Sequence, residues 1–333
     1  MIKRLLGIIL TGLIFFSISM NQGLKSKQMK YNFFIVSHGG AADPFWAVVK
    51  RGMEDAAKIL SENPEFDVKA VYFGPAVASP TEVVKLLDMA AAAKPDGIAV
   101  TITDPYVIDE AVRRIIKAGI PVIAINVPDP RPEEEKIPYL FYIGGDEYQG
   151  GVQAAKTFIK IAKERGITIK KSVAAPQEIG HVGLESRADG FIKVMNENGI
   201  RADKLRLYGE DPTKSVEILR SYIRTHPETN VLFTLGPMGT LAAVTFLKEE
   251  GLTGKILHGT YDLDPFTLEA IKKKITLFTI VQQPYLQGYL PILYLTLYKR
   301  FLLRPLSDIL TGPAIVDISN VEKIEELIKK GYW

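Results

Sequence analysis

The chain has 333 residues, of which 47% are hydrophobic and 24% charged, a composition typical of globular proteins and long enough for two medium-sized domains. Its net charge of +3 is too small to indicate nucleic acid or an anionic membrane as the main partner. The sequence contains no cysteine, so we expect no disulfide, no thiolate metal site and no lipid attached through an N-terminal cysteine.

Residues 1–27 differ from the rest of the chain. Lys3 and Arg4 precede an apolar run over residues 5–20, and the polar stretch NQGLKSKQ follows it. This order is typical of a secretory signal peptide, and the run is shorter than the ~20 residues that usually span a bilayer. The sequence therefore predicts export, by a cleaved signal or, because the cleavage pattern is weak, with an uncleaved membrane anchor.

Short β-branched or aromatic runs then alternate with segments of helical period. Strands are predicted at 31–37, 68–73, 97–102 and 121–126, and helices at 45–62, 80–93 and 105–118. Repeated strand, helix and strand indicate a parallel sheet that is covered by helices on both faces.

The same alternation returns after a loop at 128–138 that is rich in proline and charge. Strands are predicted at 170–175, 205–208, 231–235 and 255–261, and helices at 148–164, 185–198, 213–225 and 238–250. The tail adds helices at 264–273, 285–301 and 321–330 and strands at 277–281 and 313–318. Two such series exceed one compact sheet, so we predict an α/β protein with two similar lobes.

Ligands of open parallel sheets bind beyond the carboxyl ends of the strands. There the segment Asp43-Pro44-Phe45-Trp46 places two aromatic rings at the start of a helix. The apolar face of a sugar stacks on such rings, while Asp43, Asn126 and Asp262 would hydrogen-bond its hydroxyls. The alternative is that one ring belongs to the core and the other packs against the helix start.

Several segments, in this order, resemble the periplasmic solute-binding proteins of the ribose, galactose and inositol type, whose fold is shared by LacI-type effector domains. The resemblance runs from about residue 31 to 320. It rests on DPFW (43–46), TITDPY (101–106), IPVIAIN (120–126), GGDEYQGG (144–151), GLESRADGF (183–191), THPETNVLFT (225–234), GTYDL (259–263) and TIVQQPYLQGY (279–289).

The resemblance implies the type I fold of these proteins, two Rossmann-like lobes with parallel sheets joined by a three-segment hinge. The crossings are expected near 144–146, 280–283 and 311–313, where Gly144, Gly145 and Gly312 would serve as hinge residues. Residues 31–144 and 283–312 would then form the N-terminal lobe. Residues 145–282 and 313–333 would form the C-terminal lobe.

The family pattern also implies stacking by Phe45 and Trp46, and hydroxyl recognition by a set of polar residues at strand ends. The complete predicted ligand-binding set is Asp43, Phe45, Trp46, Thr101, Asp104, Asn126, His181, Glu185, Gly236, Asp262 and Gln282. His38 is a further candidate, and Arg187 is interpreted as part of a structural ion pair.

Three positions depart from the ribose-type pattern. Glu185 replaces an arginine, Gly236 replaces an asparagine, and Glu210 lies near the place of an aromatic residue. Because a carboxylate accepts hydrogen bonds where an arginine donates them, these changes argue against ribose itself as the ligand.

The function implied by the resemblance is a monomeric, extracytoplasmic receptor that captures a sugar or polyol and delivers it to an ABC permease. No catalytic residue, cofactor or nucleic-acid partner is expected, and the four histidines lack metal-ligand spacing. A receptor for chemotaxis or for a sensor kinase would use the same cleft and stays open. A glycosidase would need two of Asp43, Asp104, Glu185 and Asp262 as acid and base, but no motif pairs them.

Overall fold

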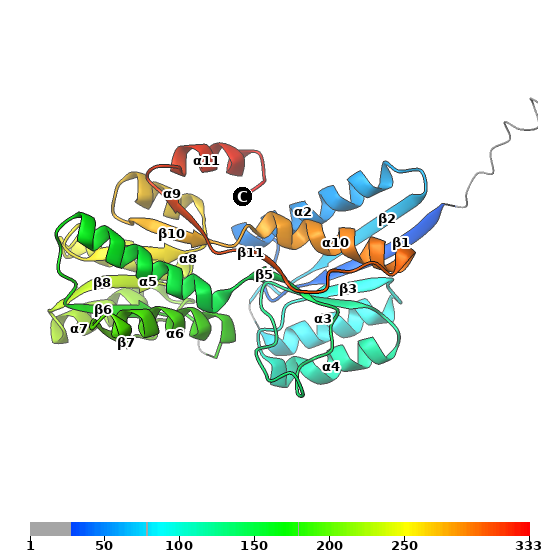
Figure 1. The fold of residues 1–333 in the computed structure, drawn as a ribbon, viewed down its shortest axis with the longest axis horizontal. Coiled ribbons are helices and arrows are strands. Elements are labelled where there is room, and N and C mark those ends of the chain that lie inside the picture. The colour runs from blue at the N-terminus through cyan, green and yellow to red at the C-terminus, as the bar shows by residue number, and fades with distance from the viewer. Residues whose placement is uncertain (1–27, 78, 179) are drawn as a thin grey trace, which may run out of the picture.

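A computed structural model describes residues 28–77, 79–178 and 180–333 of the chain. Two α/β lobes lie side by side, each built on a six-stranded sheet (Figure 1). The predicted fold class, with two similar lobes on parallel sheets, is confirmed. The predicted signal peptide or anchor lies outside the described residues.

The first lobe contains a fully parallel sheet with the strand order β11-β5-β4-β3-β1-β2. Its strands are β1 (Met29–Val36), β2 (Phe66–Phe73), β3 (Gly97–Val100), β4 (Val122–Ile125), β5 (Tyr142–Gly145) and β11 (Ile309–Gly312). Helices α2 (Pro44–Ser61) and α10 (Pro284–Phe301) cover one face, and α3 (Pro80–Ala92) and α4 (Pro105–Lys117) cover the other (Figure 1). Because helices cover both faces, β3 and β4 are apolar and buried along their whole length.

The second lobe repeats this order, position by position, as β12-β10-β9-β8-β6-β7. Its strands are β6 (Lys171–Ala175), β7 (Arg201–Lys204), β8 (Thr229–Thr234), β9 (Leu257–Tyr261), β10 (Phe278–Val281) and β12 (Ala314–Asp317), and β12 is antiparallel to β10. Its helices are α5 (Glu147–Glu164), α6 (Val182–Glu197), α7 (Pro212–Thr225), α8 (Pro237–Glu249), α9 (Pro265–Lys272) and α11 (Val321–Lys329). Among the described residues, no helix combines the length and the apolarity needed to cross a bilayer.

One helix pair in each lobe is packed so closely that glycine is required. In the first lobe, a Cβ at Gly52 of α2 would overlap the carbonyl of Tyr285, and one at Gly288 of α10 would overlap the carbonyl of Val49. The pair α5 and α6 has the same reciprocal contact in the second lobe, through Gly151 and Gly190. These helices therefore cannot move apart or rotate without disturbing the core that they share with the sheet.

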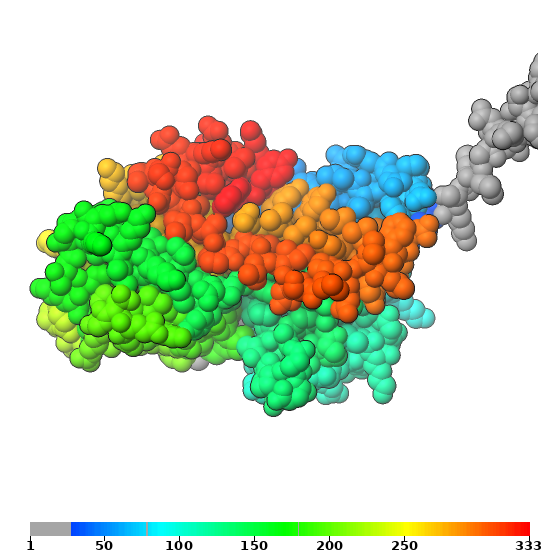
Figure 2. All heavy atoms as spheres, viewed as in Figure 1, coloured from blue at the N-terminus to red at the C-terminus, as the bar shows by residue number. Residues whose placement is uncertain are grey.

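The chain passes between the lobes three times, from β5 to α5, from β10 to α10 and from β11 to β12 (Figure 1). The peptide bond at the third passage, Gly312–Pro313, is cis. Residues near the C-terminus extend over both lobes on the face shown in Figure 2, where they are coloured orange to red.

Three strands differ from the sequence expectation. The strand predicted at 205–208 lies instead at 201–204, because an edge strand pairs on one side and can be polar, as Arg-Ala-Asp-Lys is. Strands β5 and β11 were not predicted: both are short, and their terminal glycines are poor strand formers.

Candidate ligand-binding cleft

The carboxyl ends of the two sheets face each other and enclose a cavity of about 100 Å³, here named the inner cavity. Residues of both lobes line it: His38, Asp43, Phe45, Trp46, Asn126, Gln177, Glu178, His181, Leu184, Arg187, Pro237, Asp262 and Gln282. Seven members of the predicted binding set meet here, namely Asp43, Phe45, Trp46, Asn126, His181, Asp262 and Gln282. The cavity lies where open α/β sheets bind ligands.

Aromatic rings form one wall of the inner cavity. Asp43 caps α2 by accepting hydrogen bonds from the backbone N–H groups of Phe45 (2.8 Å) and Trp46 (3.4 Å), which fixes where both rings start. The Trp46 ring is 5% exposed and lies edge-on to Phe45 and to His38, with centroids 5.0 and 4.8 Å away. Across the cleft, the centroid of the His181 ring lies 5.4 Å from that of the His38 ring.

A chain of amide and carboxylate groups forms the floor and links the two lobes. Asn126 Nδ2 donates to Gln282 Oε1 (3.2 Å), and Gln282 Nε2 donates to Asp262 Oδ1 (2.8 Å). Gln287 joins the chain from α10 by accepting from Asn126 Nδ2 (3.1 Å) and donating to Thr311 Oγ1 (3.2 Å).

Two residues of this floor, Asn126 and Asp262, hold left-handed backbone conformations, with φ of 62° and 64°. They follow β4 and β9, the strands that occupy equivalent places in the two sheets. Such conformations cost free energy in residues other than glycine and concentrate at functional sites, so their recurrence at equivalent strand ends indicates a site built by both lobes.

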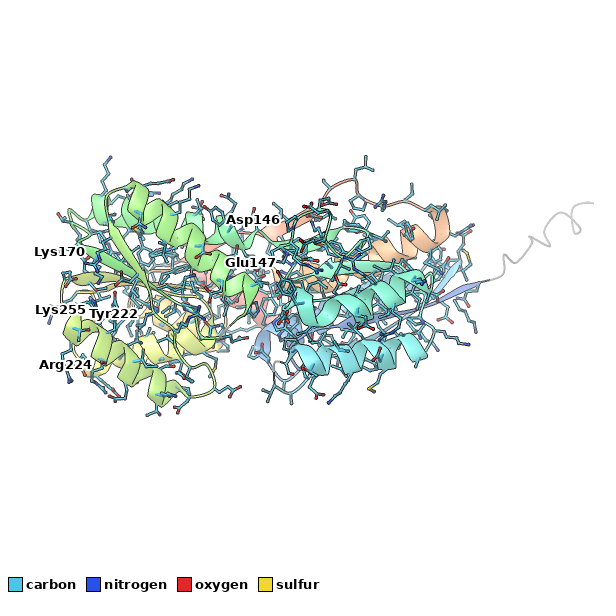
Figure 3. The ribbon with its side chains drawn as sticks, turned by 90° about the horizontal axis from the view of Figure 1, so that it is seen from below. Asp146, Glu147, Lys170, Tyr222, Arg224 and Lys255 are labelled. Carbon is cyan, nitrogen blue, oxygen red and sulfur yellow. The ribbon has the colours of Figure 1, made fainter. Side chains whose placement is uncertain are left out.

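Arg187 supplies a buried positive charge behind the floor. Its guanidinium pairs with the Glu147 carboxylate, donates to the Leu235 carbonyl (2.8 Å), approaches Asp262 Oδ2 (3.4 Å) and lies over the ring of Tyr261. Figure 3 shows Glu147 at the junction of the lobes. Burial raises the pKa of Glu147 and of Asp262 despite the opposing effect of Arg187. The structural ion pair interpreted from the sequence is thus present, and it lies against the cavity.

Both histidines of the cleft are neutral at pH 7. His181 caps α6 because its Nδ1 accepts from the backbone N–H groups of Gly183 (3.2 Å) and Leu184 (3.3 Å). Burial and the charge of Arg187 lower the pKa of His181 to about 4. Burial, together with His181 and Arg187, holds the pKa of His38 well below its ordinary value.

A second, larger cavity of about 570 Å³ adjoins the first and is named the outer cavity. It is lined by His38, Ala76, Val77, Ser79, Pro80, Thr103, Asp104, Gln177, Glu178, Gly180, His181, Leu207, Tyr208, Gly209, Glu210 and Met238. Four of these residues, His38, Gln177, Glu178 and His181, line both cavities, so the two lie next to each other.

Known proteins share this arrangement. Residues 33–299 match the family described as periplasmic binding protein domain. This chain belongs to the periplasmic binding protein family. The resemblance found in the sequence is thereby confirmed.

One relative is similar to this chain in sequence, and two solved structures are similar to it in fold. The xylose/arabinose-binding protein of Sulfolobus acidocaldarius is 30% identical over 292 residues, which are 84% of this chain and 69% of the relative. A carbohydrate transporter of Acidothermus cellulolyticus, solved with myo-inositol, is 27% identical with a TM-score of 0.78, covering 92% of this chain and 100% of its own. A periplasmic sugar-binding protein of Legionella pneumophila is also 27% identical, with a TM-score of 0.75 and 85% and 99% coverage.

Four predicted residues of this periplasmic binding protein lie outside the inner cavity. Asp104 lines the outer cavity and caps α4 through the N–H groups of Tyr106 and Val107. Thr101 is buried and lines neither cavity. Gly236 starts α8, where a Cβ would overlap the side chain of Gln177.

Glu185, the fourth of these residues, lies apart from both cavities. Its carboxylate pairs with Lys204 (2.6 Å) and Arg206 (3.0 Å) and lines neither cavity. Two residues along a helix turn by about 200°, so Glu185 and Arg187 of α6 point to opposite sides, and the charged side chain at the cavity is Arg187. The argument from Glu185 against ribose therefore loses its structural basis.

The sequence analysis missed Gln177, Glu178, Leu184 and Pro237 as cavity-lining residues, and Gln287 as the residue that ties α10 to the floor. Gln177 and Glu178 follow β6 directly, so their position at a strand end was the available signal. Gln287 lies inside a helix, where sequence offers no comparable signal.

Proposed function

We propose that this protein binds a sugar or polyol in the cleft between its lobes, outside the cytoplasm, and delivers it as a monomer to an ABC importer. The observation that carries the proposal is the inner cavity, in which an aromatic wall faces a floor of amide and carboxylate groups. A sugar ring offers both matching surfaces, an apolar face and a set of hydroxyls.

The nature of two relatives supports a sugar-like ligand. One relative is described as binding xylose and arabinose, and the other was solved with myo-inositol. The Legionella pneumophila structure is described as part of an ABC sugar transporter, which supports delivery to an importer. Export would follow from the character of residues 1–27.

Binding without catalysis is the favoured chemistry because two of the three carboxylates that line the inner cavity are held by hydrogen bonds, Glu178 being the third. Asp43 caps α2, and Asp262 accepts from Gln282 and Arg187. No sequence motif assigns two of these carboxylates as the acid and base of glycoside cleavage. Incubation with sugars should therefore give a saturable binding signal and no product.

The two tryptophans of the chain offer a direct test. In a Trp333→Phe variant, Trp46 is the sole tryptophan, and a sugar that enters the inner cavity should change its fluorescence saturably. A bound ligand at 100 times its Kd should also stabilise the fold by about 2.7 kcal/mol.

The matched control is Trp46→Phe, which leaves as the sole tryptophan Trp333, a residue that does not itself line the inner cavity. A screen of pentoses, hexoses and inositols that produces neither a fluorescence change nor a thermal shift would contradict the proposed function. Release of product from a sugar would contradict the absence of catalysis.

A further inference from the structure

The outer cavity carries an inference that rests on the proposed function and extends it to the class of ligand. The inner cavity, at about 100 Å³, is small, whereas the outer one falls in the range of roughly 300–1,000 Å³ that is usual for organic ligands. His38 and His181 border both cavities, so a ligand seated on the floor lies beside the outer cavity.

Two deeply buried polar atoms of the outer cavity have unused hydrogen-bonding capacity. Thr103 is 6% exposed and Gln177 is 8% exposed. Within the described part of the chain, neither Thr103 Oγ1 nor Gln177 Oε1 has a hydrogen-bond partner. Leaving such groups unsatisfied costs about 1–3 kcal/mol each, so a ligand gains affinity if its donors reach these atoms when the two side chains rotate toward the cavity.

The charges around the outer cavity also favour a ligand that donates hydrogen bonds. Asp104, Glu178 and Glu210 contribute three carboxylates, and none of the described residues that line it is lysine or arginine. Asp104 Oδ1 is occupied by the helix cap, while Oδ2 makes no cap contact. The lining therefore offers acceptors and disfavours an anionic ligand.

Apolar side chains complete the rim. Val77, Tyr208 and Met238 line the outer cavity and are among the large hydrophobic residues of the molecule that remain exposed, at 64%, 43% and 42%. An aromatic ring with neighbouring acceptors repeats the chemistry of the inner cavity, which Trp46 and Asp262 both line.

We propose that the ligand is a glycoside of two units, with one sugar ring in the inner cavity and a second, non-anionic, hydroxyl-rich unit in the outer cavity. The second unit donates hydrogen bonds to Thr103, Gln177 and the carboxylates, and its apolar face covers Tyr208. The outer cavity is then a second subsite that ranks disaccharides above their monosaccharides.

Calorimetric titration of the full chain with matched pairs tests this, using xylose and xylobiose, glucose and cellobiose, and galactose and lactose. In at least one pair, we expect the disaccharide to bind about 10-fold or more tightly than its monosaccharide, as one to two added hydrogen bonds would give. Equal or weaker binding of all three disaccharides, with monosaccharide binding intact, would overturn the second subsite and leave the proposed function standing.

Variants of outer-cavity residues test whether the tighter binding of the disaccharide comes from that cavity. Thr103→Val keeps the side-chain shape and Glu210→Gln keeps its size; each should weaken disaccharide binding about 5-fold and change monosaccharide binding less than twofold. Glu197→Gln, at an exposed end of α6, is the matched control and should alter neither. Equal losses of affinity for the disaccharide and its monosaccharide would overturn the second subsite. Failure of every sugar to bind would overturn the proposed function with it.

Discussion

His181 has two roles in the cleft, one as part of the cavity lining and one in helix capping. Its ring lines both cavities, while its Nδ1 caps α6 as an acceptor. An imidazole can accept at Nδ1 only when that nitrogen is unprotonated, so the cap requires a neutral ring. Protonation would remove the cap and place a cation near Arg187.

The stability of the protein should therefore depend on His181 between pH 6.5 and about 4. Its folded pKa, about 4, lies below the ordinary value of 6.5, so in this interval the unfolded chain binds a proton that the folded protein does not. The free energy of unfolding should fall as the pH falls through it. In His181→Asn, which keeps a cap acceptor without a charge, urea titrations at pH 7 and pH 4.5 should show a smaller difference than in the wild type.

His226→Asn, at the end of α7, provides the control for this measurement and should leave the wild-type difference unchanged. His38, which has a lowered pKa as well, should keep part of the pH dependence in His181→Asn. If the free energy of unfolding of His181→Asn changes between pH 7 and pH 4.5 as much as that of the wild type, His181 does not titrate as the structure requires.

The residue scale also shows the limits of sequence reasoning. Asn126 and Asp262 could be found because each directly follows a strand that the sequence predicts clearly, and Asp43 and Trp46 because they begin the helix after such a strand. The direction of the Glu185 side chain could not be predicted, because it depends on the rotation of α6, which is set by packing against α5. No periodicity of α6 alone fixes that rotation.

At the scale of elements, close helix pairs position the cleft residues. The α5–α6 contact is set by Gly151, where a Cβ would overlap the carbonyl of Arg187. The backbone of the residue that supports Asp262 is therefore held by a glycine of the neighbouring helix. Elements with strong periodicity, such as α2 and α10, could be predicted to within one residue at each end, whereas β5, β7 and β11 depend on their neighbours in the sheet.

Gly151→Ala should therefore destabilise the protein and weaken ligand binding together. In an open helix this change would stabilise by up to about 1 kcal/mol through helix propensity, but overpacking costs typically 1–3 kcal/mol and here involves backbone. Displacement of α6 would carry Arg187 away from Asp262. Urea unfolding and the Trp46 fluorescence titration measure the two effects.

Lys156→Ala on the exposed side of α5 serves as the comparison and should change stability by less than about 0.5 kcal/mol. An unchanged midpoint and affinity in Gly151→Ala would mean that α5 and α6 can separate at no cost, contrary to the contact between them.

At the scale of the whole molecule, the two lobes repeat one strand order and exchange helices across their junction. β5 of the first lobe leads into α5 of the second, and β10 of the second leads into α10 of the first. The hydrogen-bonded chain from Asn126 through Gln282 to Asp262 lies at this junction, so the floor of the site includes a residue of a segment that crosses between the lobes. A ligand that contacts both lobes must favour their approach.

The absence of native cysteine allows this movement to be measured with two introduced spin labels. Glu110→Cys in α4 and Thr213→Cys in α7 place exposed labels on opposite lobes. Without ligand, the distance distribution should be broad or contain a longer component, and a saturating sugar should shift it to the shorter distance of the closed cleft. A label pair within the first lobe, Glu110→Cys with Lys85→Cys, should show no change. Because ligand can shift the population only by its differential affinity for the closed form, a distribution that does not respond to a bound sugar would mean that the two lobes form a rigid site, and that an importer must recognise the loaded protein by something other than closure.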